Sequence, residues 1–282
     1  MNNYARLHDA KSAATGLAGV TSVDPEFLRI IESVSGEFRR ETRRQYHATV
    51  ATKYFTGQGR CRTSLLLPFD AASITSLTLD EDGDGTYEIT LVENTDYFAY
   101  REVDGDANTP IYRLDINPNG TQISGWPEPD HPRALKMVCL EGYSYELEST
   151  GLTLGANIND SATSLTATGA ANKVFPGDTL VLGSEQMDVT SVAADSVTVT
   201  RAINGTTAAA HTTADTLYVR RFPRDVEEII RERVVMRRWD ANLAYTGGAP
   251  SMEEIAQTSQ IRGVRARWFS TIDAYRRTWG LG

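Results

Sequence analysis

The sequence lacks the features that mark membrane and exported proteins. Its longest aliphatic cluster is Leu65-Leu66-Leu67, far short of the roughly 18 apolar residues that cross a bilayer. The N-terminal segment MNNYARLHDAK carries Arg6, Asp9 and Lys11 where a secretory signal needs an apolar core. We therefore expect a protein that is made in the cytoplasm and is neither inserted into a membrane nor exported.

Residues and motifs that commonly carry chemistry are also scarce. Cys61 and Cys139 are too few for a disulfide framework or a cysteine-rich zinc site, so we expect reduced core thiols, with a single bridge as the alternative. The four histidines are scattered and include no i, i+4 pair. Walker loops, dinucleotide fingerprints, G-x-S-x-G elbows and H-E-x-x-H motifs are missing. These absences predict a protein with no enzymatic activity, no cofactor and no metal.

One acidic segment matches the opening of a calcium-binding loop. Asp80, Asp82, Asp84 and Gly85 follow the pattern D-x-D-x-D-G, whose clustered oxygens suit a hard cation. The twelfth position is Leu91 instead of the glutamate that closes such loops, and the flanking segments predict strands rather than helices. We interpret the segment as the tip of an acidic β-hairpin, with a calcium site as the alternative.

Lysine is rare, and charge is unevenly distributed. The chain has 24 arginines and 4 lysines, and its net charge is -9. Residues 80–106 hold ten acids and one base, whereas residues 220–282 hold twelve arginines and eight acids. The negative total argues against a protein whose whole surface binds nucleic acid. The preference for arginine suits buried or interfacial ion pairs.

The length of 282 residues predicts about two domains. Asp24-Pro25-Glu26 is a helix-start signal, and apolar residues then recur at helical spacing up to about Arg44. The end of this helix carries Arg39, Arg40, Arg43 and Arg44. We interpret them as a solvated face paired with glutamates of the same helix, with a contact to a subunit or a phosphate as the alternative.

Strand patterns follow. Between residues 48 and 140, alternating segments predict a small antiparallel β element packed against helices. From about Thr150 to Leu217 the composition shifts to Thr, Ala, Ser, Gly and Val, which is typical of a compact all-β module. The helical pattern resumes at Phe222-Pro223-Arg224-Asp225. After the break at 247–250 and a capping box at 251–254, it continues to Trp279.

We therefore predict an α+β fold. A helical connector domain with a small antiparallel β element would span residues 1–149 and 220–282. An inserted all-β domain, a small barrel or sandwich, would span residues 150–219.

The terminal helix combines aromatic residues with arginines, as interface hot spots do. Its candidate contact residues are Arg262, Arg265, Arg267, Trp268, Tyr275, Arg276, Arg277 and Trp279. The alternative is a helix that packs its aromatic stripe into the core and turns its arginines outward. DNA binding is a third option, which the nearby acids and the overall negative charge oppose.

The order of these elements resembles the head-to-tail connector proteins (adaptor, or head-completion, proteins) of long-tailed bacteriophages, over residues 20–149 and 220–282. The matching segments are the helix 24–44, Tyr54-Phe55-Thr56-Gly57, Leu65-Leu66-Leu67-Pro68, Ile74-Thr75-Ser76-Leu77, Asp96-Tyr97, Gly125-Trp126, Gly142-Tyr143 and Phe222-Pro223-Arg224-Asp225. The 150–219 insertion departs from the short form of that family. It looks like a small β module of phage structural proteins, which would decorate the ring or contact portal or tail components.

The resemblance implies a structural virion protein at the head-to-tail junction. It would form a ring, expected to be dodecameric, that docks beneath the capsid portal, passes DNA non-specifically through a channel and binds a tail-proximal stopper or tail protein. We expect the terminal-helix residues to bind the portal. We expect Asp80, Glu81, Asp82 and Asp84 to line the channel, because like-charged walls repel phosphates; the alternative places this hairpin outside the ring. The alternative function is a tail-associated adhesin whose β module binds host carbohydrate or a receptor.

Overall fold

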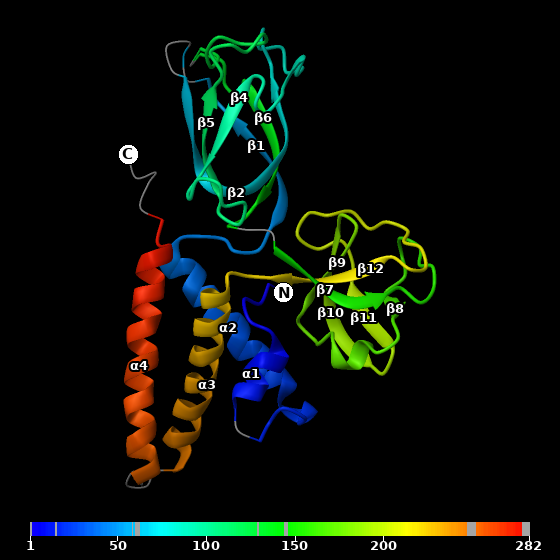
Figure 1. The fold of residues 1–282 in the computed structure, drawn as a ribbon, viewed down its shortest axis with the longest axis vertical. Helices are drawn as coiled ribbons and strands as arrows, with labels where there is room; N and C mark the ends of the chain where they lie inside the picture. Colours follow the sequence, from blue (N-terminus) through cyan, green and yellow to red (C-terminus); the bar gives the residue numbers. More distant parts are fainter. Residues whose placement is uncertain are drawn as a thin grey trace. The chain divides into compact units, whose positions relative to one another are not determined.

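The computed structural model describes residues 2–14, 16–57, 59, 63–128, 130–143, 146–246 and 252–277, and the side chains of all these except 241–246 and 252–261. The chain forms two compact units (Figure 1). The first unit contains Met1–Arg43 and Glu146–Arg277, and the second contains Arg44–Tyr145. Cys61 and Trp279 lie outside the described residues. The expected division at residues 150 and 219 stays a prediction.

The predicted fold class is wrong. The described chain is mostly β, with two antiparallel sheets of six strands each and four α-helices. Residues 44–145, which we expected to add a small β element to a helical domain, instead form a sheet as large as the one in residues 146–221. The sequence underestimates this sheet because its strands are separated by long polar loops, and such spacing does not reveal which strands pair.

Four helices lie in the first unit. They are α1 (Leu7–Ala13), α2 (Asp24–Thr42), α3 (Arg224–Thr246) and α4 (Met252–Tyr275), with a 3₁₀ turn at Thr21–Val23. The start of α2 agrees with its Asp-Pro-Glu signal, since Pro25 occupies the first turn. It ends at Arg43, whose φ of 56° breaks the helical conformation.

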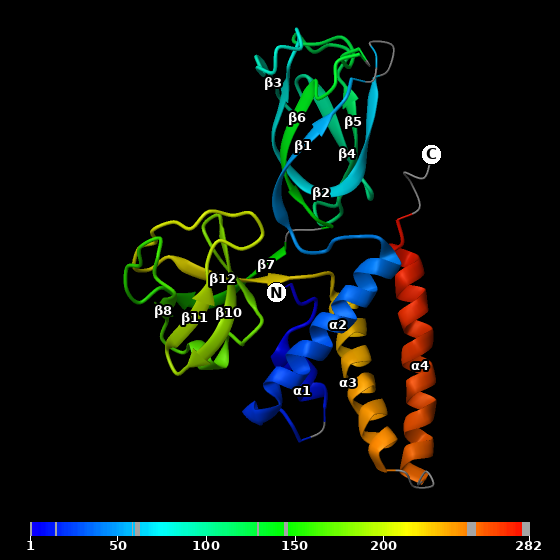
Figure 2. The same ribbon diagram turned by 180° about the vertical axis from the view of Figure 1, so that it is seen from behind.

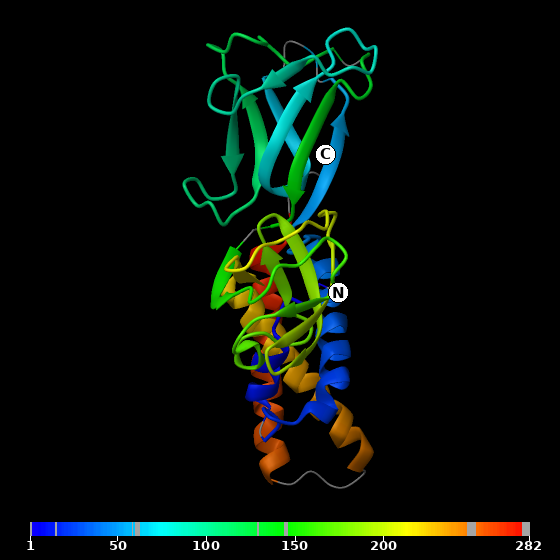
Figure 3. The same ribbon diagram turned by 90° about the vertical axis from the view of Figure 1, so that its right-hand side faces the viewer.

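Helices α2, α3 and α4 pack together (Figure 2). Glu37 of α2 pairs with Arg233 and Arg237 of α3, and Glu26 near the start of α2 pairs with Arg238. The order of these pairs makes α2 and α3 antiparallel. Figure 3 shows α3 and α4 as antiparallel neighbours. The carboxyl ends of α2 and α4 therefore lie at the same end of the bundle.

The sheet of the first unit has the strand order β7-β12-β9-β10-β11-β8. Its strands are β7 (Glu146–Thr153), β8 (Ser164–Thr166), β9 (Thr179–Leu182), β10 (Glu185–Ala193), β11 (Ser196–Thr200) and β12 (Thr216–Arg221), with a 3₁₀ turn at Ala170–Asn172. The N–H of Gly155, just after β7, donates to the carbonyl of Thr166 in β8 (2.7 Å). This bond links the two edges of the sheet around an aliphatic core.

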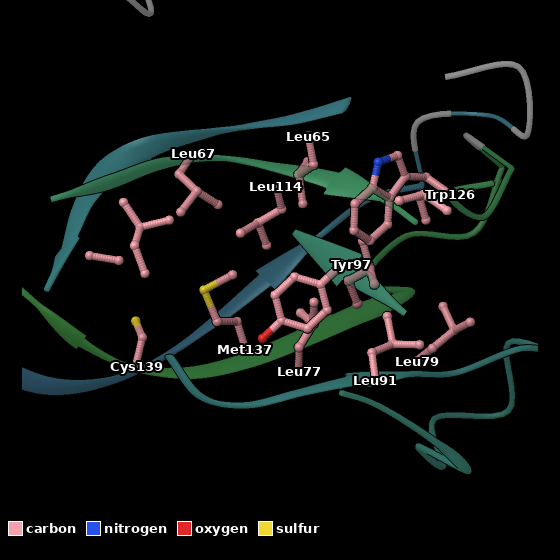
Figure 4. Close-up of a cluster of buried hydrophobic side chains, with 14 residues drawn as sticks. Leu65, Leu67, Leu77, Leu79, Leu91, Tyr97, Leu114, Trp126, Met137 and Cys139 are labelled. Carbon is pink, nitrogen blue, oxygen red and sulfur yellow. The ribbon is translucent and has the colours of Figure 1, made fainter. Parts of the chain in front are cut away.

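The sheet of the second unit has the order β1-β6-β2-β5-β4, and β3 pairs with β2. Its strands are β1 (Thr49–Phe55), β2 (Ser64–Leu79), β3 (Ile89–Leu91), β4 (Tyr97–Arg101), β5 (Ile111–Ile116) and β6 (Leu135–Glu141). Proline commonly ends a strand, and we expected the apolar run from Ser64 to close at Pro68. Pro68 instead lies inside β2, where the pairing with β5 is irregular. The core contains Leu, Met and aromatic side chains, among them Tyr97 and the fully buried Trp126 (Figure 4).

Two further observations bear on the exclusions made above. Among the described residues, no helix combines the length and the apolar character needed to span a bilayer. Cys139 is a free thiol inside the second core, and burial raises its pKa to about 11.

Candidate functional site

Helix α4 buries one side of its aromatic stripe. Trp268 is only 2% exposed and Ile272 is fully buried. The ring of Trp268 meets that of Phe38 edge-on at 5.4 Å between centroids, and the Arg233 guanidinium lies 5.3 Å from the indole centroid. Trp268, which we expected at a portal contact, therefore lies in the core of the helical bundle.

Other predicted contact residues of α4 are bonded within the first unit. Arg267 donates to both carboxylate oxygens of Glu232 at 2.8–3.0 Å. The hydroxyl of Tyr275 donates to Asp225 at 2.7 Å. Arg276, which directly follows α4, lies 3.4 Å from Asp273 of that helix. Arg267 and Tyr275 thus tie α4 to α3.

The outward side of α4 carries a different set, which we call the Phe269 face: Arg262, Arg265 and Phe269. Phe269 is 60% exposed, the most of any large hydrophobic side chain described. Arg262 and Arg265 are exposed and have no ion-pair partner among the described residues. Our sequence reading missed Phe269. The signal was its position one residue off the stripe that includes Trp268 and Ile272.

A second basic surface lies where α2 and α4 end, and we call it the arginine end: Arg39, Arg40, Arg43, Arg276 and Arg277. The N–H of Arg277 donates to the carbonyl of Thr42 at 3.1 Å, which places the two helix ends side by side. Arg39 and Arg40 of α2 and Arg43, which follows it, are exposed and form no ion pair among the described residues. Glu37, which we expected to pair with them, binds α3 instead.

The helix dipole accounts for part of this arrangement, because positive side chains are favourable near the carboxyl ends of helices. It does not account for their number, since neighbouring like charges repel each other. The clustering therefore suggests an anionic partner.

The acidic loop, Asp80–Glu88, joins β2 to β3, which pair at Leu77↔Leu91 and Leu79↔Ile89. Asp80 is 4% exposed, and its two carboxylate oxygens accept the backbone N–H groups of Gly83 (2.7 Å) and Gly85 (2.9 Å). Asp80, which we expected to line the channel, is thus a buried residue that organises the loop from inside.

Three predicted channel residues, Glu81, Asp82 and Asp84, are exposed. The backbone N–H of Thr86, and then its side chain, lower the pKa of Asp84. Its negative charge is therefore retained to lower pH than in an ordinary aspartate.

The calcium-loop pattern brings four carboxylates together. Single oxygens of Asp80, Asp82, Asp84 and Glu88 lie within 4.8 Å of one another. Asp80 is already committed to two backbone donors, and Leu91, at the closing position, is buried in the core. The cluster is a pattern that exposed acidic loops share, and by itself it identifies no ligand.

The acidic stretch 80–106 does not form one surface. Arg101 donates to the carbonyl of Ala72 at 3.2 Å, and Glu102 binds Arg44 at 2.7 Å. Asp80 follows the last residue of β2, so the length of Ala72–Leu79, roughly 23 Å at 3.3 Å per residue, separates the two acidic groups. The acidic loop thus carries only part of the charge counted in the sequence.

A buried ionic cluster holds the sheet of the first unit, and our sequence reading missed it. Nε and Nη2 of Arg201 each donate to Glu185 at 2.6 Å, and the N–H of Ala209 and the ring of His211 lie 3.0 Å from the same carboxylate. Burial alone would raise the pKa of Glu185, but these hydrogen bonds hold it at about 2. The cluster is saturated with internal partners, so we assign it to stability.

The N-terminal segment docks on the same sheet. Arg6 binds Asp178 at 2.7 Å, and the ring of His8 stacks on Phe175 with centroids 4.5 Å apart. Asn2 and Asn204 exchange side-chain hydrogen bonds at 2.9 and 3.0 Å. These contacts fix α1 to the β sheet within the first unit.

Comparison of the chain with protein-family models, with curated proteins and with solved structures gives no match. Three candidate surfaces remain to be explained by their own chemistry. They are the arginine end, the Phe269 face and the acidic loop.

Proposed function

We propose that this chain is a structural virion protein, a ring-forming connector between a bacteriophage portal and its tail, in which the arginine end docks on the portal. The observation that carries the proposal is a contrast between two sets of arginines. Arg233, Arg237 and Arg267 each pair with a glutamate of a neighbouring helix. Arg39, Arg40 and Arg43 at the arginine end have no such partner among the residues that the structure describes, although they belong to the same bundle.

This contrast supports docking on an acidic protein surface. Guanidinium groups form paired hydrogen bonds with carboxylates, so a cluster of them at one end of a rigid bundle suits a partner that presents several acids. Docking of this kind is steered by charge and weakened by salt. It replaces the contact that we first placed on Trp268.

The acidic loop supports the channel part of the proposal. Glu81, Asp82 and Asp84 are exposed on a loop that Asp80 holds in one conformation. In a ring of subunits, expected to be dodecameric, repeated loops would form an acidic wall. Such a wall repels phosphates and lets DNA pass without binding. The opposite face of the ring would receive the tail-proximal protein.

The proposal is tested by the affinity for the portal protein of the same phage. Arg39→Glu/Arg40→Glu/Arg43→Glu should weaken binding at least about tenfold and reduce its salt dependence. Arg29→Glu is the control, because Arg29 is exposed towards the other end of α2, where a negative charge suits the helix dipole. Unchanged portal binding by the triple variant would contradict the proposal. A second result would also contradict it: the unchanged chain binds duplex DNA but not the portal, and the triple variant loses the DNA binding.

A further inference from the structure

The first unit has an apolar groove where α1, α3 and α4 meet. Its volume is about 320 Å³, and its apolar lining comes from Val235, Met236 and Trp239 of α3, Val264 of α4 and Ala13 of α1. The Arg267–Glu232 ion pair borders it. A groove lined by aliphatic, thioether and aromatic groups favours an apolar side chain as its occupant.

The same unit exposes a side chain of matching chemistry. Phe269 is 60% exposed, although removing an aromatic ring of this size from water is favourable. On a helix of 100° per residue, Phe269 lies about 140° from Val264 and about 160° from Arg267, both of which line the groove. The Phe269 ring therefore faces away from the groove of its own chain, and only another chain can bring the two together.

Unpaired charges around the two surfaces are complementary. Arg262 and Arg265 precede Phe269 by seven and four residues on α4. On α3, Glu228 lies seven residues before Val235 and Asp240 lies four residues after Met236, so both acids flank the groove. Both are exposed and lack ion-pair partners among the described residues.

The spacing agrees as well. Arg262 is about 10.5 Å along the helix axis from Phe269, and Glu228 is about 10.5 Å from Val235, at 1.5 Å per residue. Arg231 also lines the groove and partly offsets its acids. The aromatic side chain, rather than charge, is therefore expected to supply most of the affinity.

We propose that Phe269 of one copy of this chain inserts into the α1–α3–α4 groove of a second copy, with Arg262 and Arg265 beside Glu228 or Asp240. Because the donor and acceptor surfaces differ, the contact is heterologous and leaves one free surface at each end. It can therefore continue around a ring or along a filament. The role of this contact between subunits of a connector ring rests on the proposed function. Self-association through Phe269 does not depend on the proposed function.

The test is sedimentation of the full chain over a range of concentrations. Phe269→Gln removes the inserted ring, and Ala13→Trp fills the groove from an exposed position. Each should weaken self-association at least about 30-fold, the loss expected for a hot spot. Leu66→Thr is the matched control, because Leu66 is 59% exposed but belongs to the second unit. It should associate like the unchanged chain.

Mixing the two variants tests the direction of the contact. Phe269→Gln keeps a free groove and Ala13→Trp keeps a free ring, so an equimolar mixture should form heterodimers that grow no further. Should Ala13→Trp fail to fold, Glu228→Arg/Asp240→Arg replaces it: this variant should associate weakly alone and regain association with Arg262→Glu/Arg265→Glu.

The inference is overturned if the unchanged chain stays monomeric at every concentration, if Phe269→Gln associates normally, or if the mixture forms no heterodimer. None of these results affects portal binding through the arginine end, so the two proposals fail separately. Phe269→Gln that associates normally but loses portal binding would overturn the inference and move the portal contact to the Phe269 face.

Discussion

Trp268 and Phe269 are consecutive in α4, yet the first is 2% exposed and the second is 60% exposed. The two side chains diverge by about 100° around the helix axis. Trp268 lies in contact with Phe38 and Arg233, whereas Phe269 is on the surface. This divergence separates a residue that stabilises the bundle from one that is available to a partner.

Trp268→Ala should therefore destabilise the first unit by about 3–5 kcal/mol, because it leaves a cavity in the core. Phe269→Gln should change the free energy of unfolding by less than about 0.5 kcal/mol, as exposed substitutions usually do. Urea denaturation of both variants measures the difference. Equal destabilisation would show that Phe269 also belongs to the core.

Glu185→Gln should cost the first unit about 3–5 kcal/mol, because it leaves the buried guanidinium of Arg201 without its counter-ion. Asp195→Asn is a suitable control, since Asp195 is exposed and its side chain accepts the N–H of Gly169 at the surface. Thermal unfolding followed by circular dichroism compares the two. A small loss of stability in Glu185→Gln would contradict the claim that the charge of this carboxylate stabilises the first unit.

The same cluster predicts a dependence of stability on pH. Glu185 has a pKa of about 2 in the folded protein against an ordinary value of 4.5. Its contribution is therefore complete above pH 4.5 and is lost as the pH falls through about 2, a change of about 3 kcal/mol. Denaturation at several pH values should show a steeper acid-side loss for the unchanged chain than for Glu185→Gln. Parallel profiles would contradict the assignment.

Asp80→Ala should open the acidic loop and destabilise the second unit by about 2 kcal/mol, since two charge-assisted hydrogen bonds are lost. Hydrogen exchange of the Gly83 and Gly85 amides should accelerate at the same time. Asp82→Ala removes an equal charge from an exposed position. Its carboxylate accepts the N–H of Asp84 at 3.2 Å and neither glycine amide, among the described residues, so this variant should leave both measurements nearly unchanged. Protected glycine amides in Asp80→Ala would refute the role of this carboxylate.

Local signals predicted local structure well. The Asp24-Pro25-Glu26 start of α2 is encoded in consecutive residues, and the hairpin around the acidic loop is encoded by a turn between two apolar runs. The size of the second sheet depends on pairing between distant segments, such as β1 with β6, which no local pattern specifies. Pro68 was misleading because proline is tolerated where the pairing is irregular.

The candidate surfaces show the same limit. The composition of α4 indicated aromatic and arginine contacts, but only the neighbouring helices decide that Trp268 is buried and Arg267 is paired. Glu37 could have paired within its own helix, but it pairs with Arg233 and Arg237 of α3 instead. Periodicity alone does point to Phe269, which lies off the apolar stripe.

The central claim is that this chain forms a ring on a portal, and electron microscopy of the purified chain mixed with the portal protein of its phage tests it most directly. We predict a second ring stacked coaxially on the portal, with an open channel, and its loss in Arg39→Glu/Arg40→Glu/Arg43→Glu. Portal particles that remain bare at saturating concentrations of the unchanged chain would contradict the account.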